Sequence, residues 1–395
     1  MITIQEALDL VLSQKQSYGI EEIPLTEAVG RFLAEDIFTD RDAPPFDRVM
    51  MDGIAIHLAD LQDSLKPNYP IQGIQAAGSP QMNLIDTSHC LEVMTGAILP
   101  INTNTIIPYE EIEIKGGKAH LNIEKVAKRF IHYQGSDSKK GEKVLGKGKQ
   151  INTGDIGILA TVGQAKVKVA KLPKAAIIST GDELVDVDQS PLPHQIRKSN
   201  VYSLWASLHQ DGIQAEMHHI LDDKEALREK LSSLVKDFDI LLLSGGVSKG
   251  KFDHIPEILE ELGVQKLFHR IAQRPGKPFW FGHHEEFNTK IFAYPGNPVS
   301  TYVNHLFYFK QWLHASLRIG WRFETKELGE GIPGNPNLAR FISVNLDHEN
   351  GKAFPINHNG SGDLFSLAHT DGFLLLPQRE GDYSKGERFP FIAVR

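Results

Sequence analysis

Three short apolar runs in the middle of the chain each end at a glycine-bearing turn that leads toward a helix-like segment. The turns are residues 179–183 (STGDE), 244–248 (SGGVS) and 295–300 (PGNPVS). Parallel strands end at one edge of an open sheet, where ligands bind, so we expect the three turns to meet there. Glycine lets backbone approach a ligand closely, and free N–H groups at a helix start attract anions. The pattern predicts a site for a phosphate-bearing molecule.

Strand-like and helix-like segments alternate from residue 172 to about residue 320, which is typical of a doubly wound α/β domain. The segment after Asn200 is one example, because Val201, Leu204 and Leu208 form an apolar stripe. We expect Asn200 to cap this helix, and Asp222 to begin the next one in the same way.

The rest of the chain has different patterns, and we predict a multidomain α/β and β protein. Residues 1–45 plus 145–171 are expected to form a discontinuous N-terminal domain of helices and connector, and residues 46–144 an inserted β-rich module. The central doubly wound domain is placed at 172–320 and a small β domain at 325–395. Two N-terminal helices are expected, the first with a capping box from Thr3 to Glu6 and the second from Thr26 to Leu33.

Composition limits the classes of protein that fit. A chain of 395 residues holds two to four domains at about 100 to 200 residues each. A net charge of −8 argues against a general nucleic-acid binder. Cys90 is the only cysteine, so neither an intrachain disulfide nor a thiolate cluster can form, and a reducing cytoplasm fits best. No apolar run approaches the ~20 residues that span a membrane.

The second glycine turn is close to a phosphate-binding Walker loop. Gly245, Gly250 and Lys251 have the required spacing, but Phe252 stands where a hydroxyl must reach magnesium. We therefore interpret the second glycine turn as an anion-binding loop and consider an ATPase a poor interpretation. Asp253 precedes a helical stripe, so it is either a plain N-cap or a functional carboxylate.

Charged residues lie beside these turns. Asp182 and Glu183 follow the first strand, and carboxylates beside a phosphate loop can hold Mg²⁺. A solvated turn is the simpler explanation of one such pair, but acidic residues on two of the three converging turns favour a metal site. Arg274 and Lys277 lie on one turn that two prolines make stiff, and cations held in fixed positions are suited to binding an oxyanion. The alternative interpretation is a solvated loop with no ligand. The histidine pairs at 218–219 and 283–284 lack the i, i+4 spacing of a helical zinc site, so we read them as surface or strand residues.

Taken together, the motifs resemble one family closely, the MoeA proteins, whose eukaryotic relatives include the C-terminal domain of gephyrin. The resemblance runs nearly end to end. Its marks are 44–47 (PPFD), 51–53 (MDG), 94–97 (MTGA), 179–184 (STGDEL), 199–200 (SN), 245–248 (GGVS) with Gly250 and Asp253, 275–278 (PGKP), 295–300 (PGNPVS) and 360–362 (GSG). The sequence departs from the family at Ser136, where a glutamate is common, and at Val49, Met50 and Ile54 beside the second motif.

The resemblance implies a transferase that inserts molybdenum from molybdate into adenylylated molybdopterin, with Mg²⁺ present and AMP released. It also implies that the central domain is similar to the enzyme that adenylylates molybdopterin. The implied catalytic residues are Asp52, Asp182, Glu183, Asp253 and Lys277, with Asp182, Glu183 and Asp253 as magnesium ligands. The implied substrate-binding residues are Thr95, Gly181, Asn200, Gly245, Gly246, Ser248, Arg274, Pro295, Gly296, Asn297, Pro298, Ser300 and Ser361.

The resemblance also implies partners. It suggests a homodimer in which the module carrying Asp52 and Thr95 reaches the partner's cleft, and contact with the molybdopterin adenylyltransferase. Two other functions stay open at this point. The chain could itself adenylylate molybdopterin, although such enzymes resemble only the central domain, or it could be a gephyrin-like scaffold, for which retained Asp182, Asp253 and Lys277 would be unnecessary.

Overall fold

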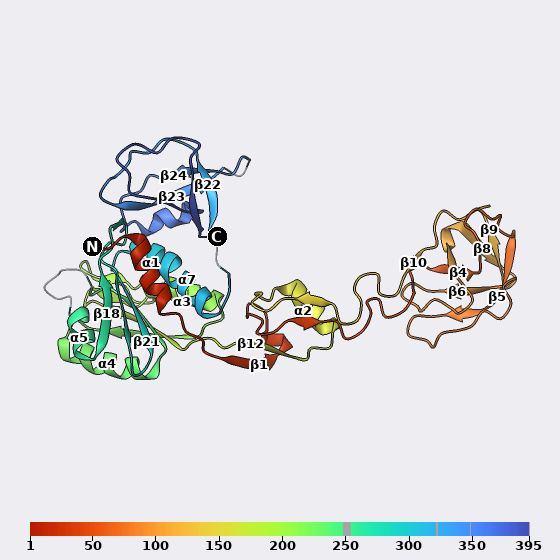
Figure 1. Cartoon of the computed structure of the whole chain (residues 1–395), viewed down its shortest axis with the longest axis horizontal. Helices are drawn as coiled ribbons and strands as arrows, with labels where there is room; N and C mark the ends of the chain where they lie inside the picture. Colours follow the sequence, from red (N-terminus) through yellow and green to blue (C-terminus); the bar gives the residue numbers. More distant parts are fainter. Residues whose placement is uncertain (248–253, 321–322, 348, 395) are drawn as a thin grey trace. The chain divides into compact units, whose positions relative to one another are not determined.

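The computed structural model describes residues 1–247, 254–320, 323–347 and 349–394 (Figure 1). The chain divides into two compact units. One, here called the α/β unit, comprises residues 1–34, 148–152 and 167–395, and the other, the β unit, comprises residues 35–147 and 153–166. The four domain boundaries expected from the sequence remain a prediction.

A six-stranded sheet forms the centre of the α/β unit, in the order β16-β13-β17-β21-β20-β18. The first four strands in this order are parallel, and the last two pair antiparallel. The strands are β13 (Ala175–Thr180), β16 (Ala215–Ile220), β17 (Ile240–Ser244), β18 (Val264–His269), β20 (Trp280–His284) and β21 (Thr289–Tyr294). Strands buried on both faces read as continuous apolar runs, which explains the three runs in the sequence.

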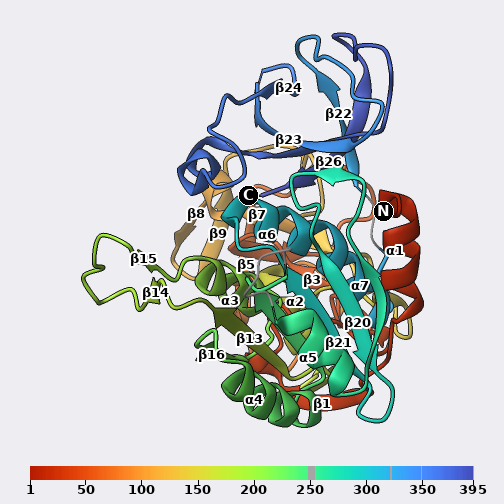
Figure 2. The ribbon, with the colours of Figure 1, turned by 90° about the vertical axis from the view of Figure 1, so that its left-hand side faces the viewer.

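Helices cover both faces of this sheet (Figure 2). Ile177, Leu242 and Phe292 pack with one group of helices, whereas Ile178 and Leu243 pack with the other, because successive strand residues point to opposite faces. The first group is α1 (Ile4–Ser13), α3 (Asn200–Gln210), α6 (Pro298–Asn304) and α7 (Lys310–Ser316), with a π-helical turn at His305–Phe309. The second is α4 (Lys224–Asp237) and α5 (Ile255–Glu261).

A second six-stranded sheet lies at the C-terminal end of the α/β unit. Its order is β19-β23-β24-β22-β26-β25, and an extra β23–β25 pairing closes five of its strands into a small barrel. The strands are β19 (Gln273–Arg274), β22 (Glu324–Leu328), β23 (Ala339–Leu346), β24 (Lys352–Pro355), β25 (Gly372–Leu376) and β26 (Arg388–Ala393). The 3₁₀ helix η4 (Leu364–His369) precedes β25. The expected C-terminal β domain is therefore present.

The N-terminal segment differs from the expectation in one respect. Helix α1 has the predicted capping box, with Glu6 N donating to Thr3 Oγ1 at 3.2 Å and Thr3 N donating to Glu6 Oε2 at 2.7 Å. The prediction of a second helix from Thr26 to Leu33 is wrong, because only the 3₁₀ turn Leu25–Glu27 forms there. Phe32 and Leu33 instead bridge to Gln150 and Val169, so pairing with distant chain outweighs local helical periodicity. Strands β1 (Ile20–Pro24) and β12 (Lys166–Ala170) pair nearby.

The β unit contains a six-stranded sheet in the order β7-β4-β6-β5-β9-β8, which confirms the expected β-rich insertion. Its strands are β4 (Gly53–Ile56), β5 (Asn68–Gln75), β6 (Cys90–Val93), β7 (Thr105–Pro108), β8 (Ile112–Lys115) and β9 (Lys118–Leu121), with the 3₁₀ turn η2 at Tyr109–Glu111. Two short pairs, β2 (Ile37–Phe38) with β11 (Lys143–Leu145) and β3 (Arg48–Val49) with β10 (Ile131–His132), and helix α2 (Thr153–Thr161) complete it. Within the described residues of the whole chain, no helix is long and apolar enough to cross a membrane.

Candidate functional site

The three glycine turns meet at one edge of the central sheet, as predicted. Strand β17 pairs in parallel with β13 on one side and β21 on the other, so all three strands end at the same edge. A cavity of about 750 Å³ lies there, and Gly181, Gly245, Gly246 and Gly296 line it. The other lining residues among those that the structure describes are Ser179, Thr180, Glu183, Leu184, Pro191, Gln195, Ile196, Arg197, Lys198, Ser199, Asn200, Val201, Asp222, Ser244, Val247, Pro298, Gly362, Leu364 and Phe365.

Gly245 and Gly246 are required by backbone geometry. Their φ angles are +101° and +67°, in the region that residues with a side chain rarely adopt. A Cβ on Gly245 would lie 3.0 Å from the carbonyl oxygen of Thr180, and one on Gly246 would lie 2.6 Å from Ile255 Cδ1. The hydroxyl of Thr180 is buried close to both glycines and has no hydrogen-bond partner among the described residues. The wall of the cavity is therefore backbone, with an unpaired hydroxyl directly behind it.

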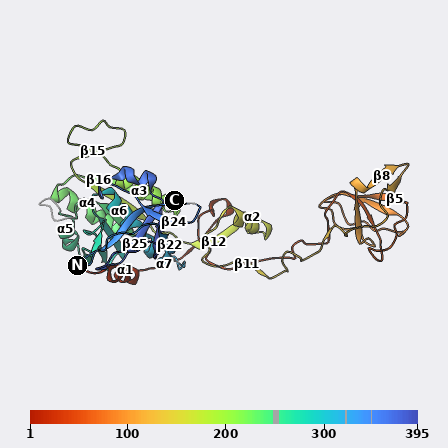
Figure 3. The ribbon, with the colours of Figure 1, turned by 90° about the horizontal axis from the view of Figure 1, so that it is seen from above.

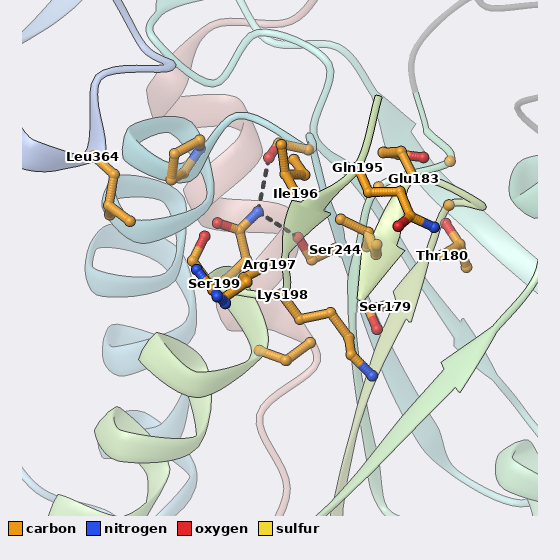
Figure 4. Close-up of a pocket in the computed structure, with 18 of the residues that line it drawn as sticks. Ser179, Thr180, Glu183, Gln195, Ile196, Arg197, Lys198, Ser199, Ser244 and Leu364 are labelled. Atoms are coloured by element: carbon orange, nitrogen blue, oxygen red, sulfur yellow. Dashed lines mark hydrogen bonds between the residues drawn. The ribbon is translucent and has the colours of Figure 1, made fainter. Parts of the chain in front are cut away.

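Asn200 joins the second and third turns. Its Nδ2 donates to Ser244 Oγ at 2.8 Å and to the carbonyl oxygen of Gly296 at 2.7 Å, and lies 3.4 Å from Thr301 Oγ1. Figure 4 marks the bond to Ser244 with a dashed line. The predicted capping role is wrong, because Ser199 occupies the N-cap position of α3 and makes no side-chain cap. Asn200 instead fixes the distance between two strand ends.

Some of the acidic residues near the first glycine turn line the cavity, and others lie beside it. Glu183 and Asp222 line the cavity. Asp182 is exposed, and its Oδ1 accepts a hydrogen bond from Asp222 N at 3.1 Å. Asp222 does not cap α4 as expected, since Asp223 Oδ1 accepts from Ala226 N at 2.8 Å. Ser248, Gly250, Lys251, Phe252 and Asp253, which include the near-match to a Walker loop, lie outside the described residues.

This donor set fits magnesium held together with a ligand. Mg²⁺ is usually bound by one or two carboxylates plus substrate phosphates and water, and Glu183 and Asp222 supply two carboxylates at the cavity wall. No group of three potential ligands from His, Cys, Asp and Glu occurs among the described residues, so a cage made entirely by protein is absent there. The paired histidines lie in β16 and β20 as strand residues.

The third turn is held from the C-terminal end of the chain. Asn297 Nδ2 donates to Ser361 Oγ at 2.9 Å, and Val299 N donates to Ser361 O at 3.1 Å. The carbonyl oxygen of Pro295 accepts from Thr301 Oγ1 at 2.5 Å. Ser300 is buried. Gly296 and Pro298 thus face the cavity, whereas the other predicted residues of this turn support it.

Arg274 and Lys277 are exposed and do not belong to the cavity lining. Arg274 lies in β19, which pairs with β23 of the C-terminal sheet. The turn packs closely against α6, because a Cβ on Gly276 would lie 2.7 Å from the Asn304 side chain, whose Nδ2 donates to the carbonyl oxygen of Gly276 at 3.1 Å. Their role with an oxyanion remains a prediction.

Sequence reasoning missed two segments that line the cavity. Residues 184–198, here called the strap, contain the paired strands β14 (Leu184–Val185) and β15 (Ile196–Arg197) and extend from the edge of the α/β unit (Figures 2 and 3). The strap places Gln195, Arg197 and Lys198 at the cavity, and η4 adds Leu364 and Phe365 from far along the chain. Phe365 is 87% exposed. Neither segment has a strong periodic pattern that could have revealed it.

Asp52 and Thr95 lie together in the β unit. Asp52 Oδ1 accepts hydrogen bonds from Thr95 N at 2.6 Å and Thr95 Oγ1 at 2.7 Å, and both residues are exposed. These bonds to the charged form hold the pKa of Asp52 below its usual value. At the position where the family often has glutamate, Ser136 is followed by Asp137, whose Oδ1 is 2.8 Å from His132 Nε2.

Three family models match successive parts of the chain. They are described as "MoeA N-terminal region (domain I and II)" at residues 2–163, "Probable molybdopterin binding domain" at 176–315 and "MoeA C-terminal region (domain IV)" at 325–394. A molybdopterin molybdenumtransferase from Synechocystis is 37% identical over 401 residues, which cover the whole of both chains. One from Bacillus subtilis is 29% identical and covers all of this chain and 94% of its own.

Solved structures agree with these matches. The molybdopterin biosynthesis MoeA protein from Pyrococcus horikoshii superposes with a TM-score of 0.80 at 29% identity, over 99% of each chain. The similarity therefore extends through the central sheet, the C-terminal barrel and the β-rich insertion, and the fold class expected from the sequence is confirmed. This chain belongs to the MoeA family of molybdopterin molybdenumtransferases.

Proposed function

We propose that this chain transfers molybdenum from molybdate to adenylylated molybdopterin in molybdenum cofactor biosynthesis, releasing AMP. The observation that carries the proposal is the meeting of three glycine turns in one cavity at the carboxyl edge of β13, β17 and β21. Such an edge binds phosphate linkages through backbone N–H groups. The names of the full-length relatives supply the reaction.

In this proposal the cavity recognises both parts of a nucleotide-linked substrate. Gly245, Gly246 and Gly296 bring backbone close to the phosphate linkage, and Asn200 keeps their turns in register. Phe365 and Ile196 are exposed by 87% and 59% and line the same cavity, so they offer apolar surface for a planar ring. Stacking of a base on an aromatic side chain contributes about 1–3 kcal/mol.

Magnesium would be held by Glu183 and Asp222 together with the substrate phosphates, with Asp182 fixing Asp222 through its backbone N–H. When bound, the ion supplies positive charge that offsets charge on the phosphate oxygens. Asp253 stays a proposed ligand beyond the described residues. Arg274 and Lys277 stay proposed contacts for molybdate, on a turn outside the cavity lining.

We also propose a cytoplasmic homodimer in which Asp52 and Thr95 of one subunit act at the cleft of the other, and contact with the adenylyltransferase that supplies the substrate. The hydrogen-bonded yet exposed arrangement of Asp52 and Thr95 supports the first point, since their paired side chains remain available to a ligand or partner.

The function is tested by following AMP release from adenylylated molybdopterin in the presence of Mg²⁺, with and without molybdate. We expect release that requires molybdate and yields molybdenum bound to the pterin product, and that falls in Glu183→Gln but not in Glu327→Gln. Glu327 is a suitable control because it pairs with Lys352 in the C-terminal sheet. AMP release that is indifferent to molybdate would contradict the transferase proposal.

Subunit mixing tests the shared cleft. Asp52→Asn and Asn200→Ala variants should each lose activity, because each removes one half of the composite site. After random reassociation of equal amounts, about a quarter of wild-type activity should return, since half of the dimers are mixed and each carries one intact site. Absence of any recovery, with exchange verified by mass, would show that both residues act within one subunit.

A further inference from the structure

Lys198 is a nearly buried cation in the wall of the substrate cavity. Its side chain is only 10% exposed, and its Nζ lies 2.7 Å from Asp186 Oδ1. Asp186 belongs to the strap but is absent from the lining, and its side chain is 51% exposed. Arg197, the other cation among the described lining residues, is exposed and donates Nε to the carbonyl oxygen of Gln189 at 3.0 Å.

Burying an ammonium group is costly unless its charge and its three N–H donors are satisfied. The single Asp186 contact neutralises the charge but accepts only one donor. No other partner of Lys198 Nζ occurs among the described residues, so within that part of the chain two donors remain for an acceptor that enters the cavity. An oxyanion is the natural acceptor, because hydrogen bonds between charged groups are about twice as strong as neutral ones.

The strap holds Lys198 at a fixed place relative to the first glycine turn. Lys198 N donates to the carbonyl oxygen of Val185 at 3.0 Å, and Ile196 N donates to that of Glu183 at 2.8 Å. The parallel pairing of β14 with β15 joins the same two segments. The backbone of Lys198 is thus fixed beside Glu183 and Val185, and the contact with Asp186 holds its ammonium; Figure 4 shows the Lys198 side chain among the residues that line the cavity.

We infer that Lys198 binds a tetrahedral oxyanion group of the substrates, and that Asp186 acts as a positioning residue that holds its ammonium in the cavity wall. The inference rests on the proposed function and assigns a cation inside the cavity, where Arg274 and Lys277 do not lie. The oxyanion is either the phosphate of the nucleotide or molybdate itself, which share this geometry and charge.

The two sources are separated by measuring AMP affinity by calorimetry and the KM for molybdate by AMP release. Lys198→Gln should weaken one of the two by roughly 10- to 100-fold, the range expected for a lost charge-assisted hydrogen bond. A change in AMP affinity with unchanged adenosine affinity identifies the phosphate, and a change in the KM for molybdate identifies the oxyanion substrate. Lys198→Arg keeps the charge but changes the donor geometry, so it should retain more of the affinity than Lys198→Gln.

A matched control is Lys352→Gln, which removes a lysine 2.9 Å from Glu327 at a position outside the cavity and should change neither quantity. Asp186→Asn tests positioning. Its effect should disappear in the Lys198→Gln background, because the two residues act as one unit. Thermal unfolding of each variant verifies that it is folded.

The inference is overturned if folded Lys198→Gln binds AMP and uses molybdate as wild type does, or if the Asp186 and Lys198 effects simply add. That outcome leaves the proposed function intact, because wild-type AMP release still depends on molybdate. Failure of that dependence would instead overturn the proposed function, whatever Lys198 does.

Discussion

Replacing Asn200 with alanine measures how much the glycine turns depend on one side chain. The amide makes two short hydrogen bonds, of 2.8 Å to Ser244 Oγ and 2.7 Å to Gly296 O, and a longer one of 3.4 Å to Thr301 Oγ1. Each short bond is worth about 1 kcal/mol net, and a buried partner left unpaired costs about 1–3 kcal/mol. Ser244 is only 4% exposed, so we expect the α/β unit to lose about 2–4 kcal/mol of unfolding free energy.

The loss should also reach the chemistry, because the bonds hold the ends of two strands in register. Displacement of a bound substrate by 1 Å can cost about 100-fold in rate, so we expect AMP release by Asn200→Ala to fall by at least about 10-fold. Stability is measured by urea unfolding, with the transition of the α/β unit fitted separately from that of the β unit.

Asn335→Ala provides the matched control. Its side chain accepts two hydrogen bonds, from Asn337 N at 2.9 Å and Leu338 N at 3.0 Å, and it lies outside the cavity. This variant should lose stability but keep normal AMP release. If Asn200→Ala unfolds within about 0.5 kcal/mol of wild type and releases AMP normally, the reasoning from its hydrogen bonds is wrong.

Three further predictions concern other residues of the site. Thr95→Val removes one of two hydrogen bonds to Asp52, so the lowered pKa of Asp52 should rise toward its ordinary value in an NMR titration, and an unchanged pKa would contradict the assigned cause. Because the pKa of Asp52 is depressed in the folded state, this pairing stabilises the fold above the unfolded pKa of about 3.9. The stabilisation disappears as pH falls through the folded pKa. Thr95→Val should therefore reduce the pH dependence of the unfolding free energy in this range, as measured by unfolding curves. Glu183→Gln should raise the Mg²⁺ concentration for half-maximal AMP release by about 10-fold, or about 1.4 kcal/mol, whereas an unchanged requirement would exclude Glu183 as a ligand. Phe365→Ala should weaken AMP binding by about 1–3 kcal/mol without changing pyrophosphate binding, and Phe365→Trp should preserve it; equal weakening of both ligands would refute stacking.

The central sheet and its three turns could be predicted because their signals are local. Each strand is a continuous apolar run buried on both faces, and the first two runs end in glycines with positive φ angles, Gly181, Gly245 and Gly246. Parallel topology then brings the ends together without further information. Gly181, Gly245, Gly246 and Gly296 line the cavity for this reason.

The other residues of the cavity depend on contacts between distant segments. Phe365 and Leu364 reach the cavity from η4, which Ser361 anchors to Asn297 across 64 positions of sequence. Conversely, Arg274 is close to the third turn in sequence but pairs with the C-terminal sheet, which takes it away from the lining. Asn200 lies at the start of α3, as the sequence predicted, but its side chain does not cap this helix. Its amide instead joins two glycine turns, a role that the same side chain can play and that local sequence does not distinguish from capping.

A crystal structure of the chain with AMP and Mg²⁺ shows whether the three glycine turns bind the nucleotide phosphate. We predict that the phosphate lies about 2.7–3.2 Å from backbone nitrogens of the turns around Gly181, Gly246 and Gly296. A second cavity of about 600 Å³, lined in part by Lys310, Lys326 and Phe391, offers the nucleotide another place in the same unit. AMP bound there, with the three glycine turns empty, would show that these turns are not the nucleotide site.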